Sequence, residues 1–380
     1  MRTRAAPGER AAYIALLTFG IVDAAGYSVI APVLPALAGQ SDAGPALMGL
    51  LVATFPSGMI AGFALAGIAV RRTSPVWVVL SGLGLIAVGG LGFVLSSGLP
   101  VYAAARLAMG VGSGFLWLGI TFATLARWPD QQYLCMSRVF AAYSVGGLVG
   151  PLLGSVDGVR GPFVVYTALV IAVVPMVFVL RGPAGTAAFR SDRVVLRSRG
   201  FWAASAGIAF AVLALGTLEG VLPLHFGVWW SQQQIGVVYA GISLLVAVSA
   251  VLAARIRPHR VLLAATVPVV AGLVIAGAGT AAAVWIGALV VTGVGIGMAN
   301  TGAIGVLLDV VPAQRIVTAM VLWSQIGIAG YLLAPLLGGP IAAAHGYAAA
   351  ATSVAVCALV VVVGLTRSDG AGSRRPRRER

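Results

Sequence analysis

Apolar stretches long enough to cross a lipid bilayer recur along the whole chain, and this feature limits the fold more than any other. A helix needs about 20 apolar residues to span a hydrocarbon core about 30 Å thick. Because lipid offers no hydrogen-bond partners, each stretch must be a helix rather than an open strand. The sequence therefore predicts an all-α polytopic membrane protein. Its twelve helices are expected at residues 11–38, 45–70, 75–96, 99–127, 133–156, 161–181, 200–226, 232–254, 259–279, 281–310, 315–343 and 346–366.

The composition agrees with this class and argues against enzymes and ATP-driven pumps. Hydrophobic residues make up 60% of the 380 residues and charged residues only 9%, which is too little charge to cover a soluble domain. The sequence contains no P-loop, zinc-ligand spacing, nucleophile elbow or dinucleotide fingerprint. Cys135 and Cys357 are far apart, so neither a disulfide framework nor a metal site is expected. No cofactor is predicted.

The basic residues predict the orientation in the membrane. The net charge is +14 and all 24 basic residues are arginines, which lie almost entirely at the ends of alternate predicted helices. Only Arg160 falls on the opposite side, and Arg106 lies inside a helix. Because arginine is enriched on the cytoplasmic side, both termini are expected in the cytoplasm and the protein in the cell (inner or plasma) membrane. This distribution argues against nucleic-acid binding, the other interpretation of a basic excess.

The chain is predicted to consist of two six-helix halves. The longest loop, 182–199, lies midway and is expected to be a cytoplasmic linker between an N-terminal bundle, 1–181, and a C-terminal bundle, 200–366. Residues 367–380 are expected to form a disordered basic cytoplasmic tail. The tail is suited to bind anionic lipid, but the general arginine bias of cytoplasmic segments is the favoured explanation.

Three motifs of the first half recur in the same order in the second half. Parallel six-helix repeats of this kind predict two bundles around a central site, which rock to give alternating access. The matching pairs are Gly110–Gly114 with Gly293–Gly297, Gly150–Gly154 with Ala334–Gly338, and Gly20–Asp23 with Gly216–Glu219.

Three charged residues lie within predicted helices and are the first candidates for function. Asp23 costs about 2.5–3.5 kcal/mol to insert, so proton or substrate handling is favoured over its alternative role, a structural partner for Arg106 at similar depth. Arg106 cannot lose its charge and needs an acceptor. It is expected either to bond the first helix, through its backbone or Asp23, or to take part directly in coupling. The sequence around Glu219 offers no evident basic partner, and burial favours the neutral acid, so proton or cation binding is preferred there over the alternative of a capped structural acid.

The motifs resemble those of the major facilitator superfamily over nearly the whole chain. Arg106–Gly112 resembles the fourth-helix motif R-x-x-x-G-x-G. Gly146–Gly154 reads G-x-x-x-G-P-x-x-G, which is similar to the fifth-helix motif of the twelve-helix drug–proton antiporters. Asp23 followed by Ala31–Pro35 resembles the first helix of that group, and Leu218–Pro223 is similar to the seventh helix of vesicular amine transporters.

The resemblance implies roles for further residues. Tyr27 lies four residues from Asp23 and shares its helix face. The other predicted cavity residues are polar or aromatic, with ordinary packing as the alternative: Trp117, Tyr143, Asn300, Gln325 and Tyr331. A second set is implied to act in conformational change, with the glycines and proline of the fifth helix contacting the opposite bundle and those of the eleventh doing the same. This set is Gly110, Gly146, Gly147, Gly150, Pro151, Gly154, Pro335, Gly338 and Gly339.

One loop departs from the family pattern. The loop between helices 2 and 3 normally reads G-x-x-x-D-R-x-G-R, but residues 67–75 lack the aspartate, and so does the second copy at 253–257. In the family this acid helps to lock the cytoplasmic gate. The resemblance therefore does not explain how this gate closes.

The sequence as a whole predicts a secondary active transporter, a proton-coupled exporter of small amphipathic organic molecules that are cationic or neutral. The expected partners are the substrate, protons and the lipid bilayer, with the protein acting as a monomer. One alternative is an uptake symporter or a dedicated metabolite permease. Another is a non-transporting receptor or scaffold, but such a protein would have no reason to keep acids in mirrored positions of helices 1 and 7.

Overall fold

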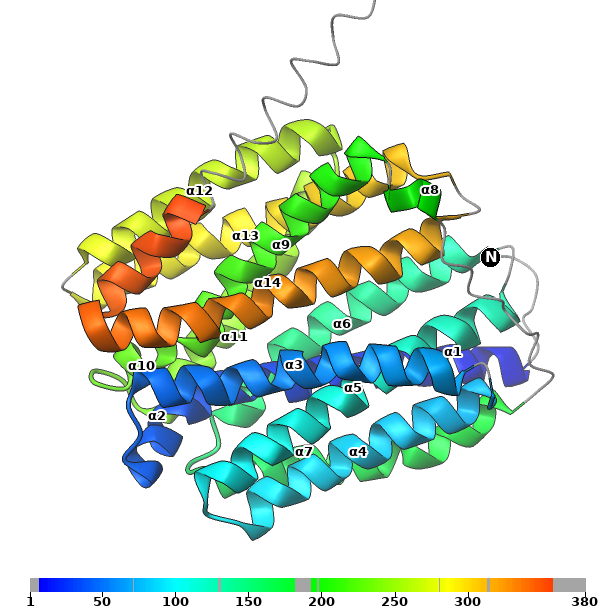
Figure 1. The fold of residues 1–380 in the computed structure, drawn as a ribbon, viewed down its shortest axis with the longest axis horizontal. Helices are drawn as coiled ribbons and strands as arrows, with labels where there is room; N and C mark the ends of the chain where they lie inside the picture. Colours follow the sequence, from blue (N-terminus) through cyan, green and yellow to red (C-terminus); the bar gives the residue numbers. More distant parts are fainter. Residues whose placement is uncertain are drawn as a thin grey trace, which may run out of the picture. The chain divides into compact units, whose positions relative to one another are not determined.

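The computed structural model describes residues 7–70, 72–128, 131–181, 193–196, 198–279, 281–312 and 315–357. Within these ranges the chain is helical apart from short connections, and no strand occurs (Figure 1). Eleven of the described helices are long and apolar enough to cross a membrane, and a shorter apolar helix covers Tyr347–Cys357. The predicted all-α polytopic fold with its apolar helices is confirmed. The tail 367–380 and most of the linker 182–199 lie outside the described residues.

The helices follow one another in the predicted order (Figure 1). The first half contains α1 (Pro7–Ser28), α2 (Ile30–Ser41), α3 (Pro45–Ala69), α4 (Pro75–Leu95), α5 (Leu99–Arg127), α6 (Gln132–Gly154), α7 (Arg160–Val173) and the 3₁₀ helix η2 (Val174–Leu180). The second half contains α8 (Arg193–Leu196), α9 (Arg199–Gly220), α10 (Leu222–Phe226), α11 (Gln232–Ala253), α12 (Pro258–Ala278), α13 (Ala282–Val310) and α14 (Ile316–His345).

The first membrane span is interrupted near its middle. The helices α1 and α2 together form the span Gly8–Ser41, and the interruption falls at Val29. Proline has no backbone N–H, so Pro32 cannot donate to the carbonyl of Ser28, four residues earlier. The break therefore leaves the last turn of α1 with carbonyl groups that need other partners.

The seventh span is also interrupted, although Val29 in the first span keeps helical dihedral angles and the corresponding residue here does not. The helices α9 and α10 form the span Arg199–Phe226, and between them Val221 has φ −125° and ψ −52°, outside the helical range. Pro223 cannot donate to the carbonyl of Glu219, four residues earlier. Glu219 thus lies two residues before a helix break, and Asp23 lies six residues before the corresponding break in the first span.

The chain divides into two compact units. The first comprises the described residues of Met1–Phe189, Leu218–Leu244 and Pro335–Ala343, and the second comprises the remaining described residues. The first unit thus includes parts of α9, α11 and α14 as well as the helices of the first half. These parts belong to it because they pack on its helices, as the end of α14 packs on α3. The predicted bundles 1–181 and 200–366 stay a prediction.

Glycines, which have no side chain, allow close helix packing in both units. In α5, Gly112 faces α4, whereas Gly110 and Gly114 face α3. In α13, Gly295 faces α12 and Gly297 faces α11. An added Cβ at any of these positions would lie within 3 Å of a neighbouring helix, so the backbones approach as closely as small residues permit. Each half therefore repeats the same packing order at these glycines.

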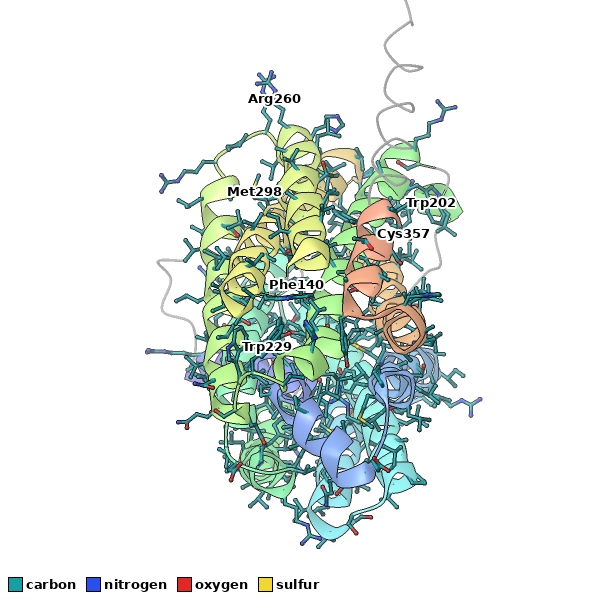
Figure 2. The ribbon with its side chains drawn as sticks, turned by 90° about the vertical axis from the view of Figure 1, so that its left-hand side faces the viewer. Phe140, Trp202, Trp229, Arg260, Met298 and Cys357 are labelled. Carbon is teal, nitrogen blue, oxygen red and sulfur yellow. The ribbon has the colours of Figure 1, made fainter. Side chains whose placement is uncertain are left out.

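Many large apolar side chains project outward from the helices. Val88, Leu95, Val251 and Val267 are each more than 60% exposed, and Trp202 also lies on the outside of its helix (Figure 2). Such a surface would be unfavourable in water but matches the hydrocarbon of a bilayer. The exposed side chains therefore agree with a chain that crosses the membrane many times.

Candidate functional site

Four polar side chains lie buried together next to the first helix break. Asp23 comes from α1, Arg106 and Ser113 from α5, and Tyr166 from α7, and none is more than 1% exposed. Gly26 of α1 makes room for this group, because a Cβ added there would lie 1.9 Å from the Tyr166 hydroxyl. Tyr166 lies near both Asp23 and Arg106. The four residues form the polar cluster of the first unit.

Arg106 ties α5 to the end of α1. Its Nη1 donates a hydrogen bond to the carbonyl oxygen of Gly26 at 3.0 Å. Gly26 lies in the last turn of α1, where carbonyl groups lack helical partners and the helix dipole favours a positive charge. The guanidinium carbon also lies 4.5 Å from the ring centre of Phe55 in α3, a cation–π contact. Arg106 was expected to bond either the backbone of the first helix or Asp23. The structure shows a hydrogen bond to the backbone.

Asp23 presents the opposite situation, a buried acid without hydrogen bonds. Both of its carboxylate oxygens are buried and accept no hydrogen bond from the described residues. The Ser113 side chain lies beside the carboxyl, but the geometry of its hydroxyl makes no hydrogen bond among these residues either. An ionised carboxylate in such surroundings is costly. A proton or a bound cation would remove that cost.

Glu219 lies at the end of α9 and is 5% exposed. Glu219 has an interaction partner in the structure, although the sequence around it offers no evident basic one. The preceding carbonyl, that of Leu218, accepts a hydrogen bond from the Tyr239 hydroxyl of α11. The helix break at Val221 makes this carbonyl available, and Tyr239 thereby stabilises the position of the turn that carries Glu219.

The predicted cavity residues of the first unit are aromatic and pack against other rings. Tyr27 meets the Phe55 ring edge-on at 5.7 Å, which places it next to the contact of Arg106 with the same ring. Trp117 of α5 meets Tyr143 of α6 at 5.5 Å and Phe140 at 4.9 Å. The first unit thus contains an aromatic group in addition to the polar cluster.

The other predicted cavity residues belong to the second unit. Asn300 lies on α13 and its Oδ1 is buried without a hydrogen-bond partner among the described residues. Gln325 is half-buried on α14. Tyr331, also on α14, is 1% exposed and lies against Gly216 of α9, where an added Cβ would be 3.0 Å from its ring. A single cavity formed by both groups of residues stays a prediction.

The glycines of α6 face a different neighbour from the one expected. Gly146, Gly150 and Gly154 recur at every fourth position, so they share one face of the helix. An added Cβ would lie 2.1 to 2.6 Å from a backbone oxygen of the first span in each case. The prediction that Gly146 and Gly150 contact the opposite bundle is therefore wrong, because their bare backbones accommodate α1 of the same half. The oxygens concerned are those of Ile21, Ala25 and Val29.

The other face of α6 contacts the second half of the chain. The carbonyl oxygen of Pro151 would lie 2.6 Å from a Cβ added to Gly236 of α11. At the end of α6, the Gln232 side chain of α11 donates to the carbonyl oxygens of Gly154, Val156 and Gly158 at 2.8, 2.7 and 2.9 Å. The proline of the fifth-helix motif thus contacts α11. Its role in conformational change stays a prediction.

The matching motif of α14 also contacts the first half. The Pro335 carbonyl oxygen and the Gly339 Cα would lie 2.4 and 3.0 Å from a Cβ added to Gly49 of α3. Gly338 faces Val221, the residue at the break in the seventh span. The part of Pro335 and Gly338 in conformational change stays a prediction.

The contact between α1 and α6 leads to a prediction with a matched control. Gly146→Ala is expected to lower stability by about 1–3 kcal/mol, because its new methyl group must displace the Ile21 backbone. Gly147→Ala adds the same methyl group on the same helix, where no atom lies within 4 Å. It should be neutral or slightly stabilising, since alanine favours helix more than glycine does. Thermal unfolding of the two purified variants tests this, and equal melting temperatures would contradict it.

Most of the site was anticipated, but three contributors were not. None of the three carries a charge, and although Ser113 lies within the Gly110–Gly114 motif, that motif points only to its glycines. The fold therefore reveals that Tyr166, Ser113 and Tyr239 meet Asp23, Arg106 or the turn before Glu219. Among the described residues, no group of three or more His, Cys, Asp or Glu side chains is placed to hold a metal ion.

Comparisons with known proteins agree with this architecture. The family model for the Major Facilitator Superfamily matches residues 16–252, more than half of the chain. No curated protein matches the chain significantly. Among solved structures, a bacterial homologue of the human lysosomal transporter Spinster, inward-facing and unoccupied, has a TM-score of 0.80 at 14% identity, with 96% of each chain covered.

Two further structures show the same fold at low identity. A D-xylose–proton symporter has a TM-score of 0.76 at 13% identity, covering 94% of this chain and 96% of its own. The human organic anion transporter MFSD10 has a TM-score of 0.69 at 16% identity, covering 95% and 100%. The apolar helices agree with a multi-pass membrane protein, these neighbours show the fold, and the family match shows that the chain belongs to the Major Facilitator Superfamily of membrane transporters.

Proposed function

We propose that the protein is a proton-coupled exporter of small organic molecules, of the drug–proton antiporter kind. The observation that carries this proposal is Asp23, whose two carboxylate oxygens are buried within a membrane helix without a hydrogen bond among the described residues. An acid in this position is stable when a proton or a cation neutralises it. Its state therefore depends on what the site has bound, as coupling requires.

Mutual exclusion at Asp23 is sufficient to produce antiport. When the site faces outward, a proton binds to the carboxylate and substrate leaves. When the site faces inward, substrate binds and the proton leaves. Glu219 is proposed to act as a second acid of the same kind, since it also lies in a buried turn beside a helix break. Arg106 is proposed to hold the turn around Gly26 and to influence the charge of the cluster.

The charges favour cationic or neutral amphipathic substrates. Asp23, Glu219 and Arg106 sum to one net negative charge when all are ionised. Aromatic faces such as those of Tyr27 and Trp117 attract cations modestly. The neighbouring structures do not decide this point, because a xylose symporter and an organic anion transporter have the same fold at 13% and 16% identity.

Everted membrane vesicles with an acidic interior test the function directly. Addition of a transported compound from a panel of cations, neutral molecules and anions is expected to make protons leave the lumen while the compound accumulates there. Vesicles that lack the protein, and vesicles treated with a protonophore, serve as controls. Proton movement in the same direction as the compound would instead establish symport, and transport of anions alone would contradict the charge argument.

The orientation is proposed from the arginines. Both termini and the 182–199 loop are proposed to face the cytoplasm of a cell membrane in which the protein acts as a monomer. A single cysteine introduced at residue 192 should react with an impermeant reagent only after the cells are opened. Labelling of this cysteine in intact cells would reverse the orientation.

A further inference from the structure

A second polar site lies at one end of the first unit, away from the polar cluster. A cavity of about 180 Å³ opens where α4 begins and where α5 and η2 end. Arg127 and Arg181 line it, together with Ser74, Trp77 and Phe178. None of the described residues that line the cavity is acidic. Two permanently charged groups thus face a space for which the lining provides no counter-ion.

Neighbouring contacts hold both arginines in place. Arg127 donates from Nη2 to the carbonyl oxygens of Val179 and Arg181, at 3.2 and 3.1 Å. The Arg181 guanidinium lies over the Phe178 ring, with its carbon 4.3 Å from the ring centre. A guanidinium held in one orientation is well suited to bind a phosphate through two parallel hydrogen bonds.

The cavity lies at the level where a bilayer changes from hydrocarbon to headgroups. The membrane spans Pro75–Leu95, Leu99–Thr124 and Arg160–Leu180 all begin or end beside it, and the two arginines lie just beyond them. Trp77 and Phe178, on its rim, are 57% and 44% exposed. Aromatic side chains at this level contact the upper part of lipid chains, and arginines there attract anionic headgroups.

The start of α4 adds to the positive character of the cavity. Ser74 precedes the helix in an extended conformation, and its side chain forms no capping hydrogen bond. The first turn of a helix carries a partial positive charge. The adjoining loop, residues 67–75, contains two arginines and no acid. The local sequence therefore offers no carboxylate that would occupy the cavity.

We propose that this cavity binds the phosphate headgroup of an anionic phospholipid. The headgroup supplies the negative charge that the protein lacks at this position. It joins the ends of α4, α5 and η2, while its acyl chains lie along the exposed rings of Trp77 and Phe178. The lipid comes from the arginine-rich side of the membrane, which is the cytoplasmic leaflet in the proposed orientation. This site is independent of the proposed antiport mechanism.

Native mass spectrometry of the purified full-length protein tests the site. In the presence of equal amounts of phosphatidylglycerol and phosphatidylcholine, the wild-type protein should retain phosphatidylglycerol preferentially. Arg181→Gln is expected to weaken that retention about tenfold, the effect of losing one charge-assisted hydrogen bond. The substitution leaves the backbone carbonyl of residue 181, and so the bond from Arg127, in place. Arg181→Lys keeps the charge and should lie between the two.

Arg260→Gln is the matched control. Arg260 is an exposed arginine at the start of α12, with its side chain directed away from the helices (Figure 2), and its loss changes the net charge equally. Unchanged retention in Arg260→Gln, with a wild-type melting temperature for Arg181→Gln in phosphatidylcholine, would support the site. Equal phosphatidylglycerol retention by wild type and Arg181→Gln would overturn it. Displacement of the lipid by millimolar inorganic phosphate alone would overturn the lipid as the occupant.

Discussion

In the Asp23→Asn variant, substrate accumulation driven by a pH gradient is expected to fall to background while the protein still reaches the membrane. The asparagine side chain keeps the size of the aspartate but cannot bind or release a proton. Because both carboxylate oxygens are buried without hydrogen bonds among the described residues, the proton is proposed to be the normal partner of this group. Flux measured in everted vesicles, with protein amounts matched, tests the expectation.

Glu219→Gln extends the same test to the second acid. Its expected effect is also a loss of proton-driven accumulation, which should be complete in the double variant. Exchange of substrate across the membrane needs no net proton movement, so a neutral substrate should still exchange in a variant that has lost only coupling. Coupling lost with exchange retained would therefore distinguish a role in proton transfer from a general failure to function.

Asp23→Asn requires a stability control because Asp23 and Arg106 both lie near Tyr166 in the polar cluster. If Asp23 mainly balances Arg106, the variant unfolds more easily and its lost flux would only resemble lost coupling. Expression and the melting temperature must therefore be measured together with transport. Full proton-driven accumulation in both well-folded single variants and in the double variant would show that neither acid carries the proton.

The fold was predictable because hydrocarbon thickness fixes the length of each apolar helix. The ninth and tenth helices, predicted at 259–279 and 281–310, occur at Pro258–Ala278 and Ala282–Val310. The interruption at Val29 was not anticipated, although Pro32 signals it. A proline within a membrane helix is tolerated, so its presence alone does not show whether the helix bends or breaks.

The charged part of the site was also predictable, whereas its partners were not. Asp23 and Arg106 are conspicuous because an intramembrane charge is costly wherever it lies. Tyr166 is an ordinary aromatic residue in a membrane helix, and only packing shows that it lies against Gly26. Gly146 illustrates a second limit. Its four-residue spacing with Gly150 shows that the two share a face, but not that this face meets α1 rather than another helix.

Arg106→Gln is expected to abolish every mode of transport, exchange included, and to lower the melting temperature. Arg106 joins three helices, because it bonds the Gly26 carbonyl of α1 from α5 and contacts the Phe55 ring of α3. Glutamine is too short and has no charge to stabilise the end of α1. The loss of a buried charge-assisted hydrogen bond predicts about 1.5–3 kcal/mol of destabilisation. Arg106→Lys keeps the charge without the planar fork and should be intermediate.

Arg138→Gln provides the comparison, because Arg138 makes the same two kinds of contact at an exposed position. It donates to the Tyr13 hydroxyl at 3.4 Å and lies 5.9 Å from the centre of that ring, so it joins α6 to α1. Its loss should change stability by less than about 0.5 kcal/mol, as is usual for surface contacts. Near-wild-type stability and exchange in Arg106→Gln would contradict a structural role for Arg106.

The Asp23→Asn/Arg106→Gln double variant then decides what Arg106 balances. If the double variant is more stable than Arg106→Gln alone, the Asp23 charge is the partner that Arg106 balances. If the two losses of stability add, the α1 backbone is that partner.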